Sequence, residues 1–102
     1  MLIHTVLLSP APDAAEGSFA EAMMILEEVA DRLPGLSGFV HGPNRDFEGK
    51  SQAYPYGFTC LFDDEAAMQA YVDDPEHQRA GAMLVANCAG GADGIFVSDL
   101  EV

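Results

Sequence analysis

The chain is 102 residues long, 49% of its residues are hydrophobic, and its formal net charge is −13. That length predicts a single domain, residues 1–102, and the composition is typical of neither a disordered chain nor a membrane protein. Seventeen acidic residues against four basic ones would repel phosphate backbones and anionic lipid surfaces. We therefore expect neither nucleic acid nor a membrane as a partner.

The first predicted element is a buried strand at residues 2–8, LIHTVLL, because aliphatic and β-branched residues follow one another there until Ser9 and Pro10. This opening is too short to cross a membrane, and it lacks the basic segment that begins a signal peptide. We expect it to be a mature N-terminus.

A helix is predicted next, beginning at Ser18. Its apolar residues recur at spacings of three and four, which gives the helix one buried face. Ser18 and Glu21 have the spacing of a capping box, and Pro34 with Gly35 ends the helix. The apolar face comprises Phe19, Met23, Leu26, Val29 and Leu33.

Two strands are predicted at residues 36–42 and 54–62, with a polar connection between them. The second strand alternates, so Tyr54, Tyr56 and Phe58 share one face of the sheet. Such an aromatic row usually packs in a core, although it would equally line a pocket for a flat, apolar molecule.

A pair of helices and a final strand complete the prediction. The first helix of the pair, residues 64–72, opens on paired aspartates that can cap it. The second has Asp74 as its N-cap and Pro75 at its first position, where the missing N–H costs nothing, and it runs to about Cys88. Residues 94–102 then form the closing strand.

This order of elements predicts an α+β fold, a ferredoxin-like four-stranded antiparallel sheet with the helices on one face. The other face of such a sheet would be too apolar to remain in water. We therefore expect a second copy of the chain to cover it, giving a homodimer through the sheet face.

The two cysteines, Cys60 and Cys88, both lie inside apolar segments and are expected to be buried free thiols, which fits a reducing cytoplasm. The sequence has no CxxC motif and no cluster of cysteine and histidine, and its carboxylates lack the spacing of metal ligands. We expect neither a metal nor a cofactor.

Three side chains are candidates for chemistry: His4, Tyr71 and His77. Tyr71 lies on the inner face of one helix, and His77 lies on the buried stripe of the next. As a site, Tyr71 would donate a hydrogen bond to a carbonyl or enolate oxygen while His77 removed the adjacent proton. As a structural joint, both would only pack, with their polar tips bonded to protein groups. His41, at a strand end, is expected at the surface.

Four stretches, taken in order, form a pattern that is specific to one protein family. They read "IHTVLL", "LPGLSGFVHGPN", "YGFTCLFDDEAAMQAYVDDPEH" and "IFVSDLEV", and the segment with Tyr71, Pro75 and His77 is the most specific part. On these residues the chain resembles the stress-responsive A/B barrel family (Dabb, dimeric α/β barrel) from end to end.

The resemblance implies two ferredoxin-like subunits that close their sheets into a dimeric α/β barrel. Some members of the family are stress-induced plant oligomers, and some are polyketide cyclases. In the cyclases, a tyrosine and a histidine at the positions of Tyr71 and His77 form the acid/base pair, and a histidine that matches His4 lines the pocket. Tyr56 and Phe58 are candidates for further pocket-lining residues.

The chain also departs from the family pattern at two places. It reads Asp74-Pro75-Glu76-His77 where members commonly read His-Pro-x-His, and the cyclases carry a histidine at about the place of Tyr56. The first hypothesis is a dimeric binder of a small apolar or aromatic molecule, or a cofactor-free acid/base enzyme of the cyclase type. A stress-associated oligomer without chemistry is the alternative, and a cofactor-free monooxygenase ranks last.

Overall fold

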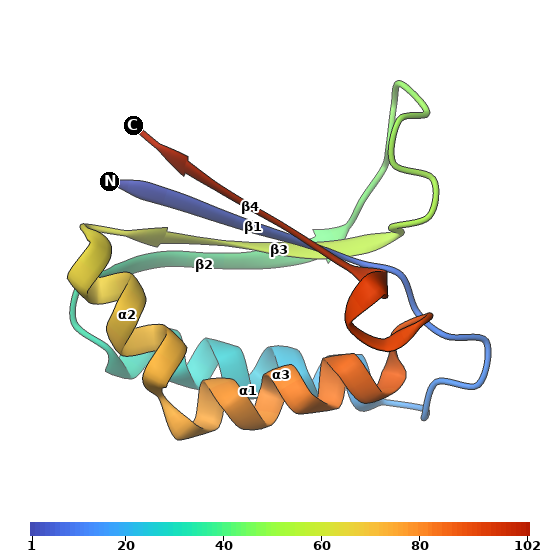
Figure 1. Ribbon diagram of the computed structural model, residues 1–102, viewed down its shortest axis with the longest axis horizontal. Coiled ribbons are helices and arrows are strands. Elements are labelled where there is room, and N and C mark those ends of the chain that lie inside the picture. The colour runs from blue at the N-terminus through green and yellow to red at the C-terminus, as the bar shows by residue number, and fades with distance from the viewer.

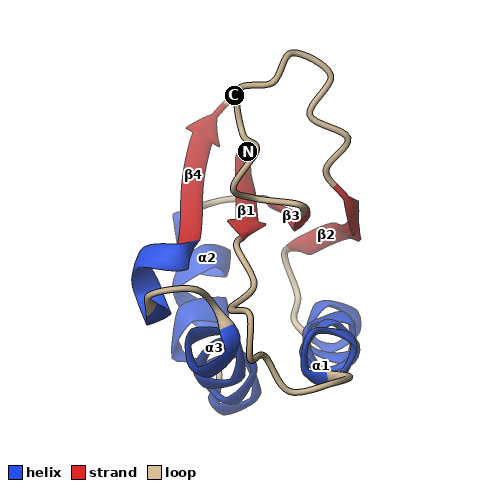
Figure 2. Cartoon of the chain, turned by 90° about the vertical axis from the view of Figure 1, so that its right-hand side faces the viewer, coloured by secondary structure: helices blue, strands red, loops and turns tan.

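The computed structural model describes residues 1–102, with a four-stranded sheet above and three α-helices below it (Figure 1). The elements are β1 (Leu2–Leu8), α1 (Ser18–Arg32), β2 (Leu36–Pro43), β3 (Tyr56–Phe62), α2 (Glu65–Asp73), α3 (Pro75–Asn87), the 3₁₀ helix η1 (Gly91–Gly94) and β4 (Ile95–Glu101). In the end-on view, α1 and α3 lie side by side under the sheet (Figure 2). No helix combines the length and the apolar character needed to cross a membrane.

The strands are ordered β2-β3-β1-β4, and every neighbouring pair is antiparallel. This arrangement confirms the predicted ferredoxin-like α+β fold. The two central strands are the first and third along the chain, so β1 pairs on both sides. Its register places His4 directly opposite Cys60 on β3 and directly opposite Asp99 on β4.

The core lies between the sheet and the helices. Alternation along β3 turns Phe58, Cys60 and Phe62 toward the helices, and all three are buried. On α1 the predicted phase is confirmed, because Leu26 is only 1% exposed while the next residue, Glu27, is exposed to solvent. The predicted state of the cysteines is also confirmed, since both are free and buried.

The helix caps agree with the sequence for the helix pair but not for α1. The Asp64 carboxylate accepts from the backbone N–H of Ala67 at the start of α2. At α1 the predicted capping box is wrong. Gly17 occupies the N-cap in a left-handed conformation with φ 77°, and Ser18 is already helical, with its hydroxyl unpartnered. Glycine adopts this conformation without strain, so it starts the helix one residue earlier than a serine cap would.

The aromatic row of β3 is shorter than predicted. The strand begins at Tyr56, and Tyr54 lies in the turn before it, with its ring 6.1 Å from that of Phe96. Phe96 belongs to the outer face of β4, so Tyr54 lies on the side of the sheet opposite to the one expected. Pro55 explains the difference, because it offers no N–H to extend the ladder.

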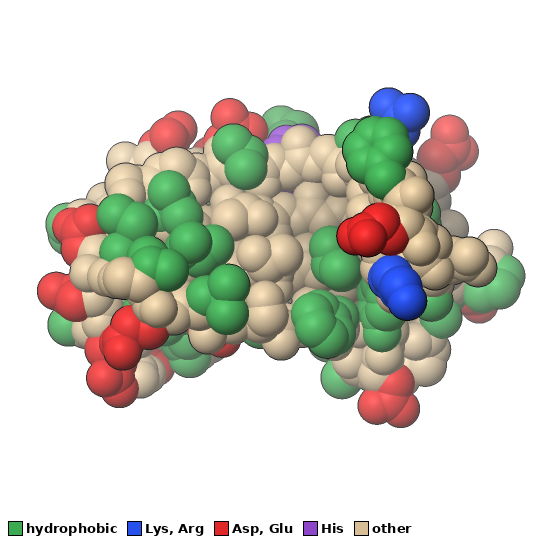
Figure 3. All heavy atoms as spheres, turned by 90° about the horizontal axis from the view of Figure 1, so that it is seen from above, with side chains coloured by type: hydrophobic (Ala, Val, Ile, Leu, Met, Phe, Trp, Pro, Cys, Tyr) green, Lys and Arg blue, Asp and Glu red, His purple; other side chains and the backbone are tan.

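The outer face of the sheet is left uncovered by the helices (Figures 1 and 3). The strand positions that point to this side are all uncharged, in a chain with 17 acidic residues. They are Ile3, Thr5, Leu7, Ser37, Val40, Gly42, Gly57, Thr59, Leu61, Phe96, Ser98 and Leu100.

Candidate functional site

Tyr71 and His77 face one another at the joint between α2 and α3. Tyr71 lies near the end of α2 and His77 in the first turn of α3, and their ring centroids are 4.0 Å apart with an angle of 40° between the planes. The joint is short because Asp74 is extended, which ends one helix and begins the next. Tyr71 is 1% exposed, and His77 is half-buried. The two candidate residues therefore share one place in the core.

Both side chains leave a buried polar atom without a partner. The Tyr71 hydroxyl oxygen and the His77 Nδ1 are enclosed, and neither has a hydrogen bond to a protein group. Most buried side-chain polar atoms in folded proteins are bonded, and each exception calls for a reason. The third such atom is the Ser18 hydroxyl oxygen, in the first turn of α1. The Cys60 thiol lies beside the Tyr71 hydroxyl and the Val72 carbonyl lies near the His77 ring, but neither makes a hydrogen bond to the unpartnered atom.

His4 approaches Tyr71 from the sheet, with ring centroids 5.9 Å apart in an edge-to-face arrangement. Its Nδ1 is 2.6 Å from the carboxylate of Asp99 on the neighbouring strand. The carboxylate holds the ring by one nitrogen, as acidic partners do for histidines that act as bases or ligands. Asp99 was missed in the sequence. Strand alternation could have revealed it, because Asp99 follows Ile95 and Val97 at intervals of two and therefore shares their helix-facing side of β4.

Burial sets the protonation of the tyrosine. It raises the pKa of Tyr71, and the Cys60 thiol beside the hydroxyl raises this pKa further. The thiol lacks the geometry of a proper hydrogen bond to that hydroxyl, and thiols are weak partners. Burial likewise raises the pKa of Cys60 to about 12. The hydroxyl therefore remains a proton donor at neutral pH.

Burial also keeps the histidine neutral. It lowers the pKa of His77 below the ordinary 6.5, and a positive charge on the nearby His4 ring acts in the same direction. The backbone carbonyl of Val72 and the carboxylate of Asp74 oppose the shift without reversing it. A neutral imidazole has one nitrogen free to accept a proton, so the pair combines a donor with an acceptor.

The position of His77 depends on Asp74. The Asp74 carboxylate accepts from the backbone N–H groups of Glu76 and His77, as an N-cap does, which confirms the predicted cap. It also accepts hydrogen bonds from both terminal nitrogens of Arg32, in the last turn of α1. These bonds, with that of Arg32 the largest cause, lower the pKa of Asp74 to about 2.

Tyr56 and Phe58 have different surroundings. The Tyr56 hydroxyl bonds to Nδ1 of His41 at 2.5 Å, and His41 is exposed, as predicted. Phe58 is buried between the rings of Phe39, at 5.6 Å, and His4, at 6.4 Å. Phe58 is thus joined to the Tyr71–His77 cluster through His4, whereas Tyr56 forms a separate pair with His41.

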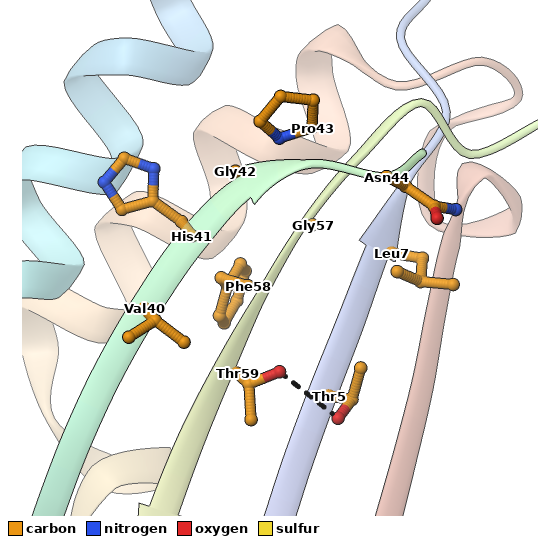
Figure 4. Close-up of a pocket in the computed structure, with 10 residues that line it drawn as sticks. All are labelled: Thr5, Leu7, Val40, His41, Gly42, Pro43, Asn44, Gly57, Phe58 and Thr59. Carbon is orange, nitrogen blue, oxygen red and sulfur yellow. Dashed lines mark hydrogen bonds between the residues drawn. The ribbon is translucent and has the colours of Figure 1, made fainter. Parts of the chain in front are cut away.

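The main hollows of the surface do not touch the cluster. One of about 240 Å³ lies on the outer face of the sheet, where Gly42 and Gly57 leave space beside the hydrogen-bonded pair of Thr5 and Thr59 (Figure 4). Two others lie in the loop after Pro43 and on the exposed side of α1. No group of three or more His, Cys, Asp or Glu side chains is arranged to hold a metal ion.

The fold and the site together define a ferredoxin-like α+β protein with a tyrosine–histidine pair enclosed beneath its sheet. Residues 2–102 match the family model described as Stress responsive A/B Barrel Domain, and the chain belongs to that family. No curated protein matches the sequence.

Solved structures resemble the chain over nearly its full length. A dimeric ferredoxin-like protein of unknown function from Jannaschia sp. CCS1 is 59% identical, with a TM-score of 0.95 and coverage of 99% of this chain and 98% of that one. A hydroxynitrile lyase from Passiflora edulis is 10% identical, with a TM-score of 0.81 and coverage of 99% and 92%. A Nitrosomonas europaea protein, provisionally described as an antibiotic biosynthesis monooxygenase, is 14% identical, with a TM-score of 0.75 and coverage of 100% and 98%. The last two share the fold alone.

Proposed function

We propose that the protein is a dimeric acid/base enzyme, acting on a flat, apolar carbonyl compound at the Tyr71–His77 pair. The observation that carries the proposal is the pair of enclosed polar atoms, the Tyr71 hydroxyl oxygen and the His77 Nδ1, that no protein group satisfies. Leaving such atoms unpaired costs about 1–3 kcal/mol each, a cost that a substrate or an ordered water would relieve. Violations of the rule that buried polar atoms are bonded are common at functional sites.

The reaction we propose is proton transfer next to a carbonyl group. His77, neutral because burial lowers its pKa, would accept the proton from the carbon beside the carbonyl. Tyr71, whose raised pKa keeps its proton in place, would donate a hydrogen bond to the oxygen on which the enolate charge develops. Return of a proton to a different atom would give isomerisation, and attack of the enolate carbon on a second carbonyl would give an aldol-type cyclisation. His4, held by Asp99, would bound the same space from the sheet.

The surroundings of the pair support an apolar, aromatic substrate. The rings of Phe62 and His4 lie 5.1 Å and 5.9 Å from that of Tyr71, and Phe58 lies beyond His4. Apolar walls with few polar groups suit a flat hydrophobic molecule held by one or two hydrogen bonds.

The homodimer forms part of the proposal. The outer face of the sheet is uncharged and carries the large apolar side chains of Ile3, Leu7, Val40, Leu61, Phe96 and Leu100. Uncovered faces of this kind mark association sites. The 59% identical Jannaschia protein is itself described as dimeric, which supports the same assembly here. Two free, buried thiols support a reducing compartment such as the cytoplasm.

Deuterium exchange tests the chemistry without knowledge of the natural substrate. Acetophenone, a flat aryl methyl ketone, exchanges its methyl protons slowly in neutral D₂O, and proton NMR follows the loss of the methyl signal. We expect the protein to accelerate exchange, with the rate falling in acid as His77 becomes protonated. Tyr71→Phe and His77→Gln should both abolish the acceleration, whereas Glu27→Ala should retain it. Exchange at the buffer rate with the unmodified protein would count against the proposal.

A second candidate is an oligomeric protein in which these residues only pack. The near-complete enclosure of Tyr71 and the position of the main hollows away from it favour this alternative. It predicts that acetophenone neither exchanges faster nor shifts the melting temperature of the protein.

A further inference from the structure

The connection from Asn44 to Pro55 stands out from the rest of the fold. It rises from one end of the sheet on the side away from the helices (Figures 1 and 2). It projects past the end of the uncovered outer face, near the contact between the rings of Tyr54 and Phe96. A molecule bound on that face would also contact this loop.

The connection is shaped by its own hydrogen bonds, although it has no helix or strand. The Asn44 side-chain amide donates to the Ser51 hydroxyl at 2.9 Å and to the Tyr54 carbonyl at 2.8 Å. The Asp46 carboxylate accepts from the backbone N–H of Lys50 and from both the N–H and hydroxyl of Ser51, each at 2.9 Å. Asp46 has a positive φ of 47°, which these bonds stabilise. A preorganised loop loses little conformational freedom when it binds.

This loop presents a large apolar side chain to water. Phe47 is 87% exposed, and its only ring partner is the guanidinium of Arg45, 5.3 Å from the ring centroid. Aromatic side chains and arginine are the residues most enriched at the centres of protein interfaces. The other exposed large apolar residues lie on strands or helices or at the termini, so Phe47 alone lies in the projecting loop.

The two basic side chains without an ion pair lie on this loop. Of the four basic residues, Arg32 and Arg79 are paired with carboxylates of their own chain, and Arg45 and Lys50 are not. The two unpaired cations therefore lie on the loop, beside a sheet face that has no charge. At the end where the loop rises, basic and acidic side chains lie among one another (Figure 3). The acids of the loop are Asp46, whose carboxylate is bonded within the loop, and Glu48. A second copy of this chain, with its net charge of −13, offers carboxylates to these cations and an uncharged face to this one.

We infer that the 44–55 loop of each copy clasps a second copy that is docked on the outer sheet face. Phe47 packs on an apolar part of the second copy, and Arg45 and Lys50 lie near its carboxylates. By two-fold symmetry the loop of the second copy makes the same contact with the first, so the dimer contains two equivalent loop contacts. The inference rests on the dimer of the proposed function and adds a second contact surface to the sheet face.

Sedimentation equilibrium of the full chain at micromolar concentration and moderate salt tests the inference. Phe47→Ser should raise the dimer dissociation constant by at least about tenfold, because it removes a central aromatic contact from both copies. Met24→Ser is the matched control, since Met24 is 63% exposed but lies on α1, away from the outer face. It should leave the dissociation constant within about twofold. An unchanged far-ultraviolet circular dichroism spectrum for both variants shows that the fold is intact.

A charge variant supplies the second arm. Arg45→Gln combined with Lys50→Gln should also weaken the dimer, and the loss should shrink as salt is raised, because the contact with the partner's carboxylates is screened. A dimer of wild-type strength for Phe47→Ser would overturn the clasp and leave the sheet-face dimer standing. A monomeric wild-type protein would overturn both. Dimerisation that is retained while Phe47→Ser abolishes binding of some other protein would assign the loop to that partner and also contradict the clasp.

Discussion

Arg32 and Asp74 form a two-pronged ion pair that ties the end of α1 to the joint between α2 and α3. The two guanidinium nitrogens of Arg32 lie 2.8 and 2.9 Å from the two carboxylate oxygens of Asp74. Asp74 also caps α3 by accepting from the backbone N–H of His77 at 3.2 Å. One carboxylate therefore positions the first turn of α3, and with it the ring that faces Tyr71.

Replacing Asp74 should separate its two tasks. Asp74→Ala removes the cap and the ion pair, and we expect it to lower the free energy of unfolding by about 1–3 kcal/mol. Asp74→Asn keeps a good cap and removes only the charge, so it should cost less. Urea melts of the two variants measure the difference. Equal losses would mean that the cap contributes nothing.

The same carboxylate should make stability depend on acid. The pKa of Asp74 is lowered from 3.8 to about 2 in the folded protein, so folding favours the charged form. This contribution is fully present above pH 3.8 and is lost as the pH falls toward 2. Melting temperatures of the wild type and of Asp74→Asn should therefore converge across that window. A constant difference between the two proteins from pH 6 to pH 2 would show that the pKa is not lowered.

The helical phase of α1 allows a packing test with adjacent residues. Leu26→Ala should lower the free energy of unfolding by about 2–5 kcal/mol, because it removes buried methyl groups and leaves a cavity. Glu27→Ala faces water and should change it by less than about 0.5 kcal/mol. Denaturant melts of both variants measure the two losses in the free energy of unfolding. Equal losses would show that the helical phase of α1 is wrong.

The sequence predicted the elements well because their signals are local. Period, alternation and the Asp74–Pro75 start of α3 depend on residues within one or two turns of each other. The face of the sheet on which Tyr54 lies was predicted incorrectly, because β3 begins at Tyr56, after Pro55, and not at residue 54. The pairs His4–Asp99, Arg32–Asp74 and His41–Tyr56 join residues 95, 42 and 15 positions apart. Such contacts depend on strand register and helix packing, and no local pattern in the chain encodes them.

The thiol beside Tyr71 should be inert in the folded protein. Burial raises the pKa of Cys60 to about 12, so almost no thiolate exists at pH 8. In a Cys88→Ala variant, which isolates Cys60, we expect an aromatic disulfide reagent to react only after urea is added. Rapid reaction of the native variant would place the thiol in an accessible pocket and contradict its burial.

Removing the unpaired hydroxyl should not destabilise the fold. Tyr71→Phe deletes a hydroxyl that has no protein partner, so it should leave the free energy of unfolding unchanged or raise it by up to about 3 kcal/mol. Tyr71→Ala, which empties a buried position, should cost about 3–5 kcal/mol and serves as the control. A loss of 1–3 kcal/mol for Tyr71→Phe would indicate a structural hydrogen bond instead.

The proposed function requires that Tyr71 and His77 share a site for a non-protein molecule. A high-resolution crystal structure of the protein as purified would reveal such a molecule in the electron density between the Tyr71 hydroxyl oxygen and the His77 Nδ1. We expect an ordered water or a bound ligand within hydrogen-bonding distance of both atoms. Density for protein alone, with both atoms bonded to neighbouring side chains or backbone, would contradict the proposed function.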